Sequence, residues 1–215
     1  MSHFSEVLLP EAQKIFPFLE DLPLQTFYLA GGTGLALQFG HRISLDYDLF
    51  SSNLELDYAD RETLKDYFKC KNVEFAIQKD KDKTLILLLE GVQVSFFSYP
   101  YPLLKTLISY KKILLASPLD IGTMKLSAVV SRGSKKDFID LYEIAQQIPL
   151  RHLLEAASQR YSKISDFPFQ VLKALSYFEE AELEPTPRLL KPLHWEKIRS
   201  FFEKETMIIA AEWLK

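Results

Sequence analysis

The sequence predicts an α/β (α+β) fold, in which a mixed or antiparallel sheet with flanking helices is followed by a helical C-terminal region. Short apolar or alternating segments bounded by turn residues, typical of strands, fall in the first half of the chain. After residue 117 the apolar residues recur at helical spacing between prolines. We therefore expect an α/β core over residues 1–103 and, over residues 104–215, a helical region that packs on this core.

Bulk composition is that of an ordinary globular protein. The chain has 215 residues, of which 47% are hydrophobic and 26% charged. The single cysteine, Cys70, permits no intrachain disulfide and fits a reducing compartment. The N-terminus has no signal-peptide pattern, and the longest apolar run, Leu85–Leu89, is too short to span a bilayer. We therefore expect a cytoplasmic protein with no membrane partner.

Turn residues and hydrophobic periods place the elements of the first half. Pro10 and Pro17 interrupt the helix expected over residues 5–20, because proline removes a backbone donor. Gly40 ends a short helix that follows a bend at residues 31–33. The other expected elements are strands over residues 26–30, 43–50, 73–78, 84–89 and 92–99, and a helix over residues 60–71.

The second half is expected to be helical. Residues 103–115 hold either a short helix or a strand. The next helix, over residues 117–131, has Ser117 at its N-cap and Pro118 at its first position. Another helix covers residues 135–147, and three or four more follow to residue 215.

A candidate phosphate-binding turn stands where the first strand meets the short helix, at Gly31, Gly32 and Thr33. Glycine has no Cβ, so the backbone N–H groups of such a turn approach an anion closely. A helix that starts there adds unpaired donors and the positive end of its dipole. A plain turn is the alternative interpretation.

A carboxylate pair follows this turn. In the strand expected over residues 43–50, Leu45, Tyr47 and Leu49 lie on one face, while Asp46 and Asp48 lie on the other, roughly 6–7 Å apart. Close like charges favour a cation between them, and Mg²⁺ (or Mn²⁺) combines carboxylate oxygens with substrate phosphates. A polar edge on a solvent-facing strand is the alternative. The nearby glycine turn leads us to favour a metal and phosphate site, which nucleotidyl transfer requires.

Positive charge gathers in a second segment. Residues 111–136 contain six basic residues and one acidic residue, which suits an anionic ligand such as a triphosphate or an RNA backbone. The candidates for such contacts are Lys125, Arg132 and Lys135. A solvated helix face is the alternative.

Two further carboxylates close this segment. Asp137 and Asp140 are three residues apart and share one face of the helix expected over residues 135–147. A carboxylate beside a cluster of cations is able to orient or deprotonate an acceptor hydroxyl. The alternative is a structural role, in which Asp137 complements the dipole at the start of the helix.

Together the two segments resemble a known family. "GGTGLALQFGHRISLDYDLF" and "DIGTMKLSAVVSRGSKKDFIDLYEI" are similar to the Gly-Gly-Ser/Thr…Asp-x-Asp and Lys…Arg…Lys-Asp-x-x-Asp motifs of the AbiEii/AbiGii toxin family of nucleotidyltransferases, which the MenT toxins also resemble. "VQVSFFSYPYPLL" resembles the segment between the motifs. The resemblance covers roughly residues 25–145.

The resemblance implies a DNA polymerase β-like nucleotidyltransferase fold whose helical region completes the active site. It implies Mg²⁺-dependent transfer of a nucleoside monophosphate (NMP) from an NTP to an acceptor hydroxyl, with tRNA as acceptor and a cognate antitoxin as partner. By motif position, the metal ligands are Asp46 and Asp48, and the phosphate contacts are Gly31, Gly32 and Thr33. The triphosphate or transition-state contacts are Lys125, Arg132 and Lys135, and the acceptor-orienting residues are Asp137 and Asp140.

One departure keeps other functions open. The wider fold usually carries a third metal carboxylate on a neighbouring strand, where this chain has Gln93, Ser95 and Phe97. Either Asp137 or Asp140 replaces that carboxylate, or a second metal binds weakly. The alternatives are NMP transfer to a protein or small molecule, and a nucleotide-binding module without turnover.

Residues outside the two motifs are open to either a functional or a structural role. His41 and Arg42 either reach a phosphate or form a solvated turn. The tyrosines Tyr99, Tyr101 and Tyr110 either stack on a base or pack in the core.

Overall fold

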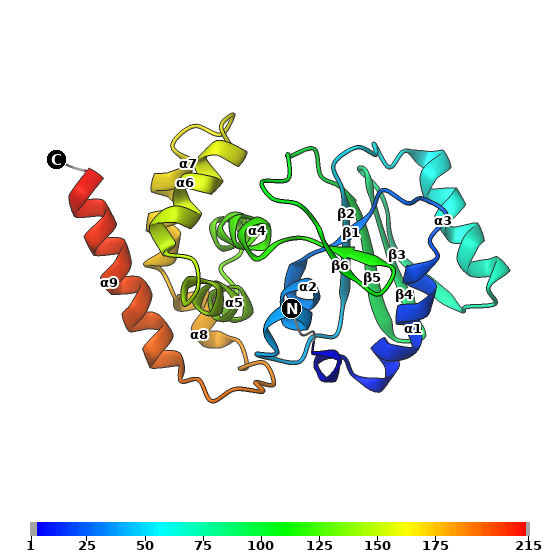
Figure 1. Cartoon of the computed structure of the whole chain (residues 1–215), viewed down its shortest axis with the longest axis horizontal. Coiled ribbons are helices and arrows are strands. Elements are labelled where there is room, and N and C mark those ends of the chain that lie inside the picture. The colour runs from blue at the N-terminus through cyan, green and yellow to red at the C-terminus, as the bar shows by residue number, and fades with distance from the viewer. Residues whose placement is uncertain (1–3, 214–215) are drawn as a thin grey trace. The chain divides into compact units, whose positions relative to one another are not determined.

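The computed structural model of the chain describes residues 4–213, and it divides into two compact units between Ser117 and Pro118 (Figure 1). Unit 1 contains η1 (Ser5–Val7), α1 (Pro10–Glu20), β1 (Tyr28–Leu29), α2 (Gly31–Phe39), β2 (Tyr47–Ser51), α3 (Tyr58–Cys70), β3 (Phe75–Lys81), β4 (Thr84–Leu89), β5 (Val92–Ser98), β6 (Ile108–Tyr110) and β7 (Ile113–Leu115). Unit 2 contains α4 (Pro118–Ser131), α5 (Lys135–Ala145), α6 (Leu150–Arg160), α7 (Phe167–Leu175), α8 (Glu179–Leu183) and α9 (Trp195–Trp213). The helical region was expected to reach residue 215, and residues 214–215 lie outside the described range.

The sheet of unit 1 is mixed, as the sequence predicts. Its strand order is β3-β4-β5-β2-β1-β7-β6. β2 pairs in parallel with β5, and β1 pairs in parallel with β7, whereas the other neighbours are antiparallel. This order places β2, the strand that carries Asp48, in the middle of the sheet, next to β5.

The division of the chain falls later than residue 103, where we expected it. Residues 104–117 supply β6 and β7, of which β7 pairs with β1 at Leu29 and Leu115. The N–H of Ala116 also donates to the carbonyl of Leu29 over 2.9 Å. These backbone bonds attach the segment to the sheet, so it belongs to unit 1.

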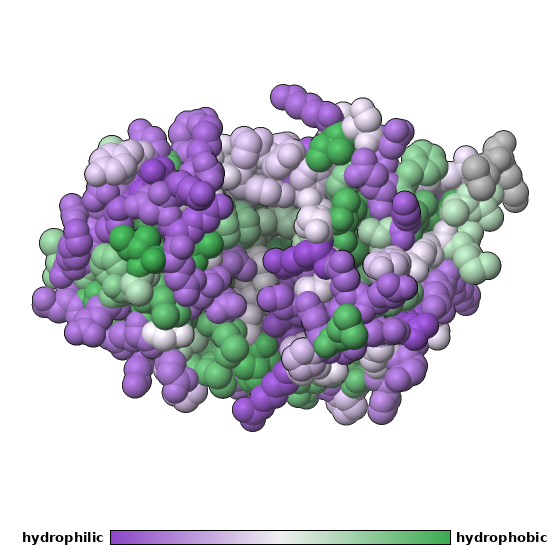
Figure 2. Space-filling view, turned by 180° about the vertical axis from the view of Figure 1, so that it is seen from behind, coloured by the Kyte–Doolittle hydropathy of each residue, from purple (hydrophilic) through white to green (hydrophobic). Residues whose placement is uncertain are grey.

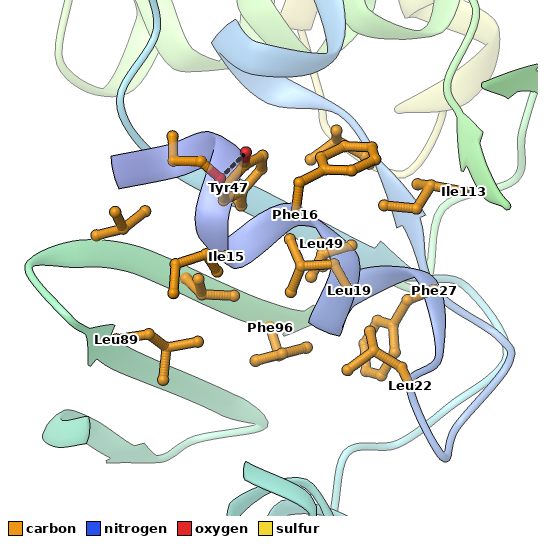
Figure 3. Close-up of a cluster of buried hydrophobic side chains, with 14 of the residues drawn as sticks. Ile15, Phe16, Leu19, Leu22, Phe27, Tyr47, Leu49, Leu89, Phe96 and Ile113 are labelled. Carbon is orange, nitrogen blue, oxygen red and sulfur yellow. Dashed lines mark hydrogen bonds between the residues drawn. The ribbon is translucent and has the colours of Figure 1, made fainter. Parts of the chain in front are cut away.

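One face of the sheet is covered by apolar side chains from α1 and α3, which lie together on one side of the strands (Figure 1). Ile15 and Leu19 of α1 lie close to Leu49 and Phe96 of the sheet, and the ring of Phe16 lies 6.0 Å from that of Tyr47 (Figure 3). Burying this many large apolar groups supplies the main stabilisation of the unit.

A hydrogen bond ties α1 to the strand of the carboxylate pair. The buried Tyr47 hydroxyl donates to the carbonyl of Ala12 over 2.7 Å (Figure 3). Because Tyr47 separates Asp46 from Asp48, this anchor fixes the strand from its buried face.

Two details of unit 1 correct the expectations. The helix expected over residues 5–20 is interrupted ahead of Pro10, which begins α1 after η1 has ended at Val7, whereas Pro17 lies inside α1 and does not break it. β2 begins only at Tyr47, so Leu45 precedes the strand and is 53% exposed instead of facing the core. The buried alternation holds for Tyr47 and Leu49.

Unit 2 is a bundle of helices held by aromatic packing and by buried ion pairs, of which one joins α4 to α6. The ring of Phe138 packs against Phe178, Trp195 and Phe202 at centroid distances of 5.2, 5.9 and 5.6 Å. Arg160 of α6 donates to a carboxylate oxygen of Asp120 in α4 over 3.0 Å, and both side chains are fully buried. The buried charge pair fixes how α6 packs on α4.

The visible surface is largely hydrophilic, with hydrophobic side chains scattered in small groups (Figure 2). Over residues 4–213, every helix is too short or too polar to span a membrane.

Candidate active site

The start of α2 lies against the carboxylate of Asp48. Gly31 is the first residue of α2 and has a φ of +60°, a left-handed conformation that glycine adopts without strain. A Cβ built on Gly31 would stand less than 3.0 Å from Oδ2 of Asp48. The missing side chain therefore leaves the room in which the carboxylate approaches the positive end of the helix.

A buried arginine reaches the same helix end. A Cβ on Gly32 would collide with Nη2 of Arg42, which is 4% exposed. The Nη1 of Arg42 donates to the carbonyl of Ile43 over 3.1 Å. The sequence left Arg42 between a phosphate contact and a solvated turn, and its burial rules out the solvated turn. The signal that marks Arg42 as a residue of the site is its approach to Gly32, which can be seen only in the structure.

Thr33 connects α2 to the carboxylate pair. Its hydroxyl is buried, bonds to the hydroxyl of Ser44 over 2.7 Å and donates to the backbone carbonyl of Asp46. The hydroxyl has two protein partners, so it positions the chain at Asp46. A phosphate contact by Thr33 stays a prediction. Its backbone N–H is a better candidate for that contact than its hydroxyl.

The two predicted metal carboxylates lie at the beginning of β2. Asp48 is in the strand, Asp46 directly precedes it, and both are half-buried. Ser95 of β5 stands opposite Asp48 in the parallel register and is fully buried. The neighbouring strand therefore offers a hydroxyl where a third carboxylate was sought.

These groups fit a divalent cation that shares its ligands with a substrate. Within the described part of the chain, no three His, Cys, Asp or Glu side chains are grouped so as to hold a metal ion. Mg²⁺ typically uses one or two carboxylates and takes its other ligands from water and phosphates. Asp46 and Asp48 match this requirement, and the amide end of α2 beside them suits the phosphates.

Aromatic rings continue from Asp48 along the same face of the sheet. Phe50 lies two residues after Asp48 and stacks with Tyr28 and Phe97 at centroid distances of 6.2 and 5.0 Å. Tyr99 packs edge-on against Phe50 at 5.4 Å. Of the three tyrosines singled out in the sequence, Tyr110 is a core residue, buried and 5.5 Å from Phe16.

Unit 2 brings together a lysine and two carboxylates from adjacent helices. The ammonium of Lys125, on α4, lies 2.8 Å from Oδ1 of Asp137 and 2.6 Å from Oδ2 of Asp140, both on α5. All three side chains are nearly or fully buried. The shared-face prediction for Asp137 and Asp140 is confirmed, with Lys125 as the cation between them.

Asp137 is saturated with donors. Besides Lys125, it accepts from Nε and Nη2 of Arg132 over 2.8 and 3.1 Å and from the Ser134 hydroxyl over 2.6 Å. Burial raises the pKa of Asp137, but the charges and hydrogen bonds of Lys125 and Arg132 outweigh it and hold the pKa well below its usual range. An acid held ionised by four donor contacts orients its partners and is a poor proton acceptor.

Lys135 is engaged elsewhere in unit 2. Its ammonium donates to the carbonyl of Glu184 and lies 5.4 Å from the centre of the Trp195 ring, while its N–H donates to Oε2 of Glu184 over 2.8 Å. The side chain is 7% exposed. These contacts join the start of α5 to the segment after α8 and favour a structural role for Lys135, while its triphosphate contact stays a prediction.

The mixed sheet and the residues grouped in each unit define a protein of the nucleotidyltransferase class. The family model described as nucleotidyl transferase AbiEii toxin, type IV toxin–antitoxin system, matches residues 18–214. The chain therefore belongs to the AbiEii family and is a nucleotidyltransferase.

Known proteins agree with this assignment. An uncharacterized protein of Aquifex aeolicus is 38% identical over 183 residues, which cover 83% of this chain and 85% of the relative. The nucleotidyltransferase toxin MenT4 of Mycobacterium tuberculosis has a similar structure, with a TM-score of 0.56 and 15% identity over 85% of this chain and 74% of that chain. The antibiotic-resistance factor ANT(2″)-Ia gives a TM-score of 0.54 and 10% identity, over 70% and 89% of the two chains. At such low identities the two solved structures bear on the fold alone.

Proposed function

We propose that this protein transfers an NMP from a metal-bound NTP to an acceptor hydroxyl of tRNA, with release of pyrophosphate, as the toxin of an AbiE-like toxin–antitoxin system. The observation that carries the proposal is the approach of the Asp48 carboxylate to the N-terminus of α2 at Gly31. It joins a metal ligand and a phosphate-binding helix end in one place. Family membership supports the toxin role and a cognate antitoxin, and we place the reaction in the cytoplasm.

In unit 1 the proposed roles follow from the side chains at the start of α2. Asp46 and Asp48 hold Mg²⁺ or Mn²⁺, which when bound polarises the α-phosphate toward attack. The amide end of α2 and the guanidinium of Arg42 bind phosphate oxygens. Thr33 holds Asp46 in place through its backbone carbonyl.

In unit 2 the proposed roles divide between two cations and two carboxylates. Lys125 and Arg132 stabilise negative charge that develops on the phosphates. Asp137 orients both cations, because it binds each of them directly. Asp140 orients the acceptor hydroxyl, with Lys125 fixing its carboxylate at 2.6 Å.

The test offers each α-³²P-labelled NTP, with Mg²⁺ and total tRNA, to the purified protein. The Asp46→Ala/Asp48→Ala double variant runs beside it, and Asp66→Ala, which removes an exposed carboxylate on α3, is the matched control. We expect label on tRNA with the wild type and the control and none with the double variant. Label on the protein would show that a protein, and not tRNA, is the acceptor. NTP binding without any label would show that the protein is a nucleotide-binding module without turnover.

A further inference from the structure

Unit 2 contains a pocket in whose lining Arg132 is the one residue with a role proposed above. It has a volume of about 550 Å³ and lies among the end of α4, the turn into α5, and α7 with the residues that follow it. This volume is within the range of sites that bind small molecules, about 300–1,000 Å³. The polar residues of its wall are Ser131, Arg132, Gln170, Lys173, Ser176, Tyr177 and Glu180.

The two cations of the pocket, Arg132 and Lys173, are both exposed. Among residues 4–213 the ammonium of Lys173 makes no ion pair, and the side chain is exposed. The side chain of Arg132 is 56% exposed although the carboxylate that orients it, Asp137, is fully buried. The guanidinium is thus oriented by Asp137, and the exposed side chain lines the pocket.

An aromatic ring and an apolar floor complement these charges. Tyr177 is 52% exposed, and its hydroxyl donates to Oε2 of Glu179 over 2.6 Å, which restrains the ring. Val129, Val130 and Ala174 supply the apolar part of the wall. A ring that can stack, cations that can bind phosphate and a polar rim that can meet base edges are the features of a site for a nucleotide.

We propose that this pocket binds an unpaired nucleotide at the 3′ end of the acceptor RNA, an inference that rests on the proposed function. The pocket has two cations, and Glu180 is the one carboxylate in its wall, so it lacks the carboxylate pair that a metal-bound triphosphate needs. A single-stranded RNA carries one negative charge per nucleotide and offers bases for stacking, which two cations and one ring can accommodate. Because Arg132 lines the pocket and binds Asp137, an RNA end held here would also contact the residue that orients Lys125.

The test measures binding and does not need turnover. Affinity is titrated for a fluorescent RNA hairpin with a short unpaired 3′ tail, for the same hairpin with a blunt end, and for an NTP with Mg²⁺. The variants are Lys173→Gln and Tyr177→Leu. The matched controls are Lys204→Gln, at an exposed position of α9, and Tyr58→Leu, at a residue of unit 1 that is 68% exposed.

We expect each pocket variant to bind the tailed hairpin about tenfold more weakly, because it loses a stacking or phosphate contact. Its affinities for the blunt hairpin and for the NTP should not change. The controls should bind all three ligands like the wild type. Unchanged binding of the tailed hairpin, equal losses for both hairpins, or a loss confined to the NTP would each overturn the inference. If tRNA receives no label in the transfer assay but the tail still binds through Lys173 and Tyr177, the proposed acceptor chemistry fails while the pocket assignment stands.

Discussion

Oδ2 of Asp48 occupies the space that a side chain on Gly31 would need. This contact brings a strand carboxylate and the start of a helix together, and only a residue without a Cβ permits it at a φ of +60°. The close approach explains why the glycine pair precedes the Asp-x-Asp in this chain.

Substituting Gly31→Ala should abolish transfer, because the added methyl displaces the Asp48 carboxylate. Gly91→Ala is the matched control, since Gly91 also has a positive φ, of +88°, but nothing lies within 4 Å of its Cβ position. Both variants should lose about 1–2 kcal/mol of unfolding free energy from backbone strain. Urea denaturation and the transfer rate are measured for both, and equal activity in the two variants would contradict the contact.

The Thr33 hydroxyl should control metal affinity through the backbone of Asp46. We expect Thr33→Val to weaken Mn²⁺ binding by about tenfold, comparable to losing an outer-shell partner of a metal ligand. Thr33→Ser keeps the hydroxyl and should bind like the wild type. Calorimetric titration with Mn²⁺ distinguishes the two, and an unaffected Val variant would show that the hydroxyl does not position Asp46.

Lys135 should prove structural. Lys135→Met removes the charge that meets the Glu184 carbonyl and the Trp195 ring, and should cost about 2 kcal/mol of stability while leaving the transfer rate of the folded protein near that of the wild type. Lys136→Met, at an exposed neighbouring position, should change neither property. A large loss of transfer activity without a loss of stability would instead support the predicted contact between Lys135 and the triphosphate.

Stability at low pH should depend on Asp137. Its folded pKa lies below the unfolded value, so the carboxylate contributes stability above the unfolded pKa of about 3.9 and loses it as pH falls toward the folded pKa. Below pH 4 this single group adds up to about 1.4 kcal/mol of destabilisation per pH unit.

Asp137→Asn removes that dependence. The variant should therefore be less stable than the wild type at pH 6 but lose less stability between pH 4 and pH 3. Urea midpoints at these pH values test the sign, and parallel curves for the two proteins would show that Asp137 is not held ionised.

Local sequence patterns predicted most elements because their signals act over a few residues. Gly40 adopts the left-handed conformation expected of a helix stop, and α4 begins at Pro118. The alternation of Tyr47 and Leu49 correctly gave the buried face of β2. The roles that the motif spacing assigns to the carboxylates of both units stay predictions.

Long-range contacts decided what the sequence left open. Residues 103–115 could hold a helix or a strand, and the strands β6 and β7 form within them, with β7 paired to β1. The contact of Arg42 with Gly32 and the engagement of Lys135 by Glu184 each join separate segments, so no local pattern encodes them. The sequence also could not reveal that Lys125 donates to Asp137, since this bond depends on how α4 packs on α5.

The most direct test of the metal and phosphate site is NTP affinity as a function of Mg²⁺ concentration in the wild type and in Asp48→Asn. If Asp48 holds the ion that bridges to the NTP, Mg²⁺ should strengthen NTP binding to the wild type by about tenfold or more, and the variant should lose this dependence while keeping its fold. An identical Mg²⁺ dependence in the two proteins would contradict the assignment of the metal to Asp48.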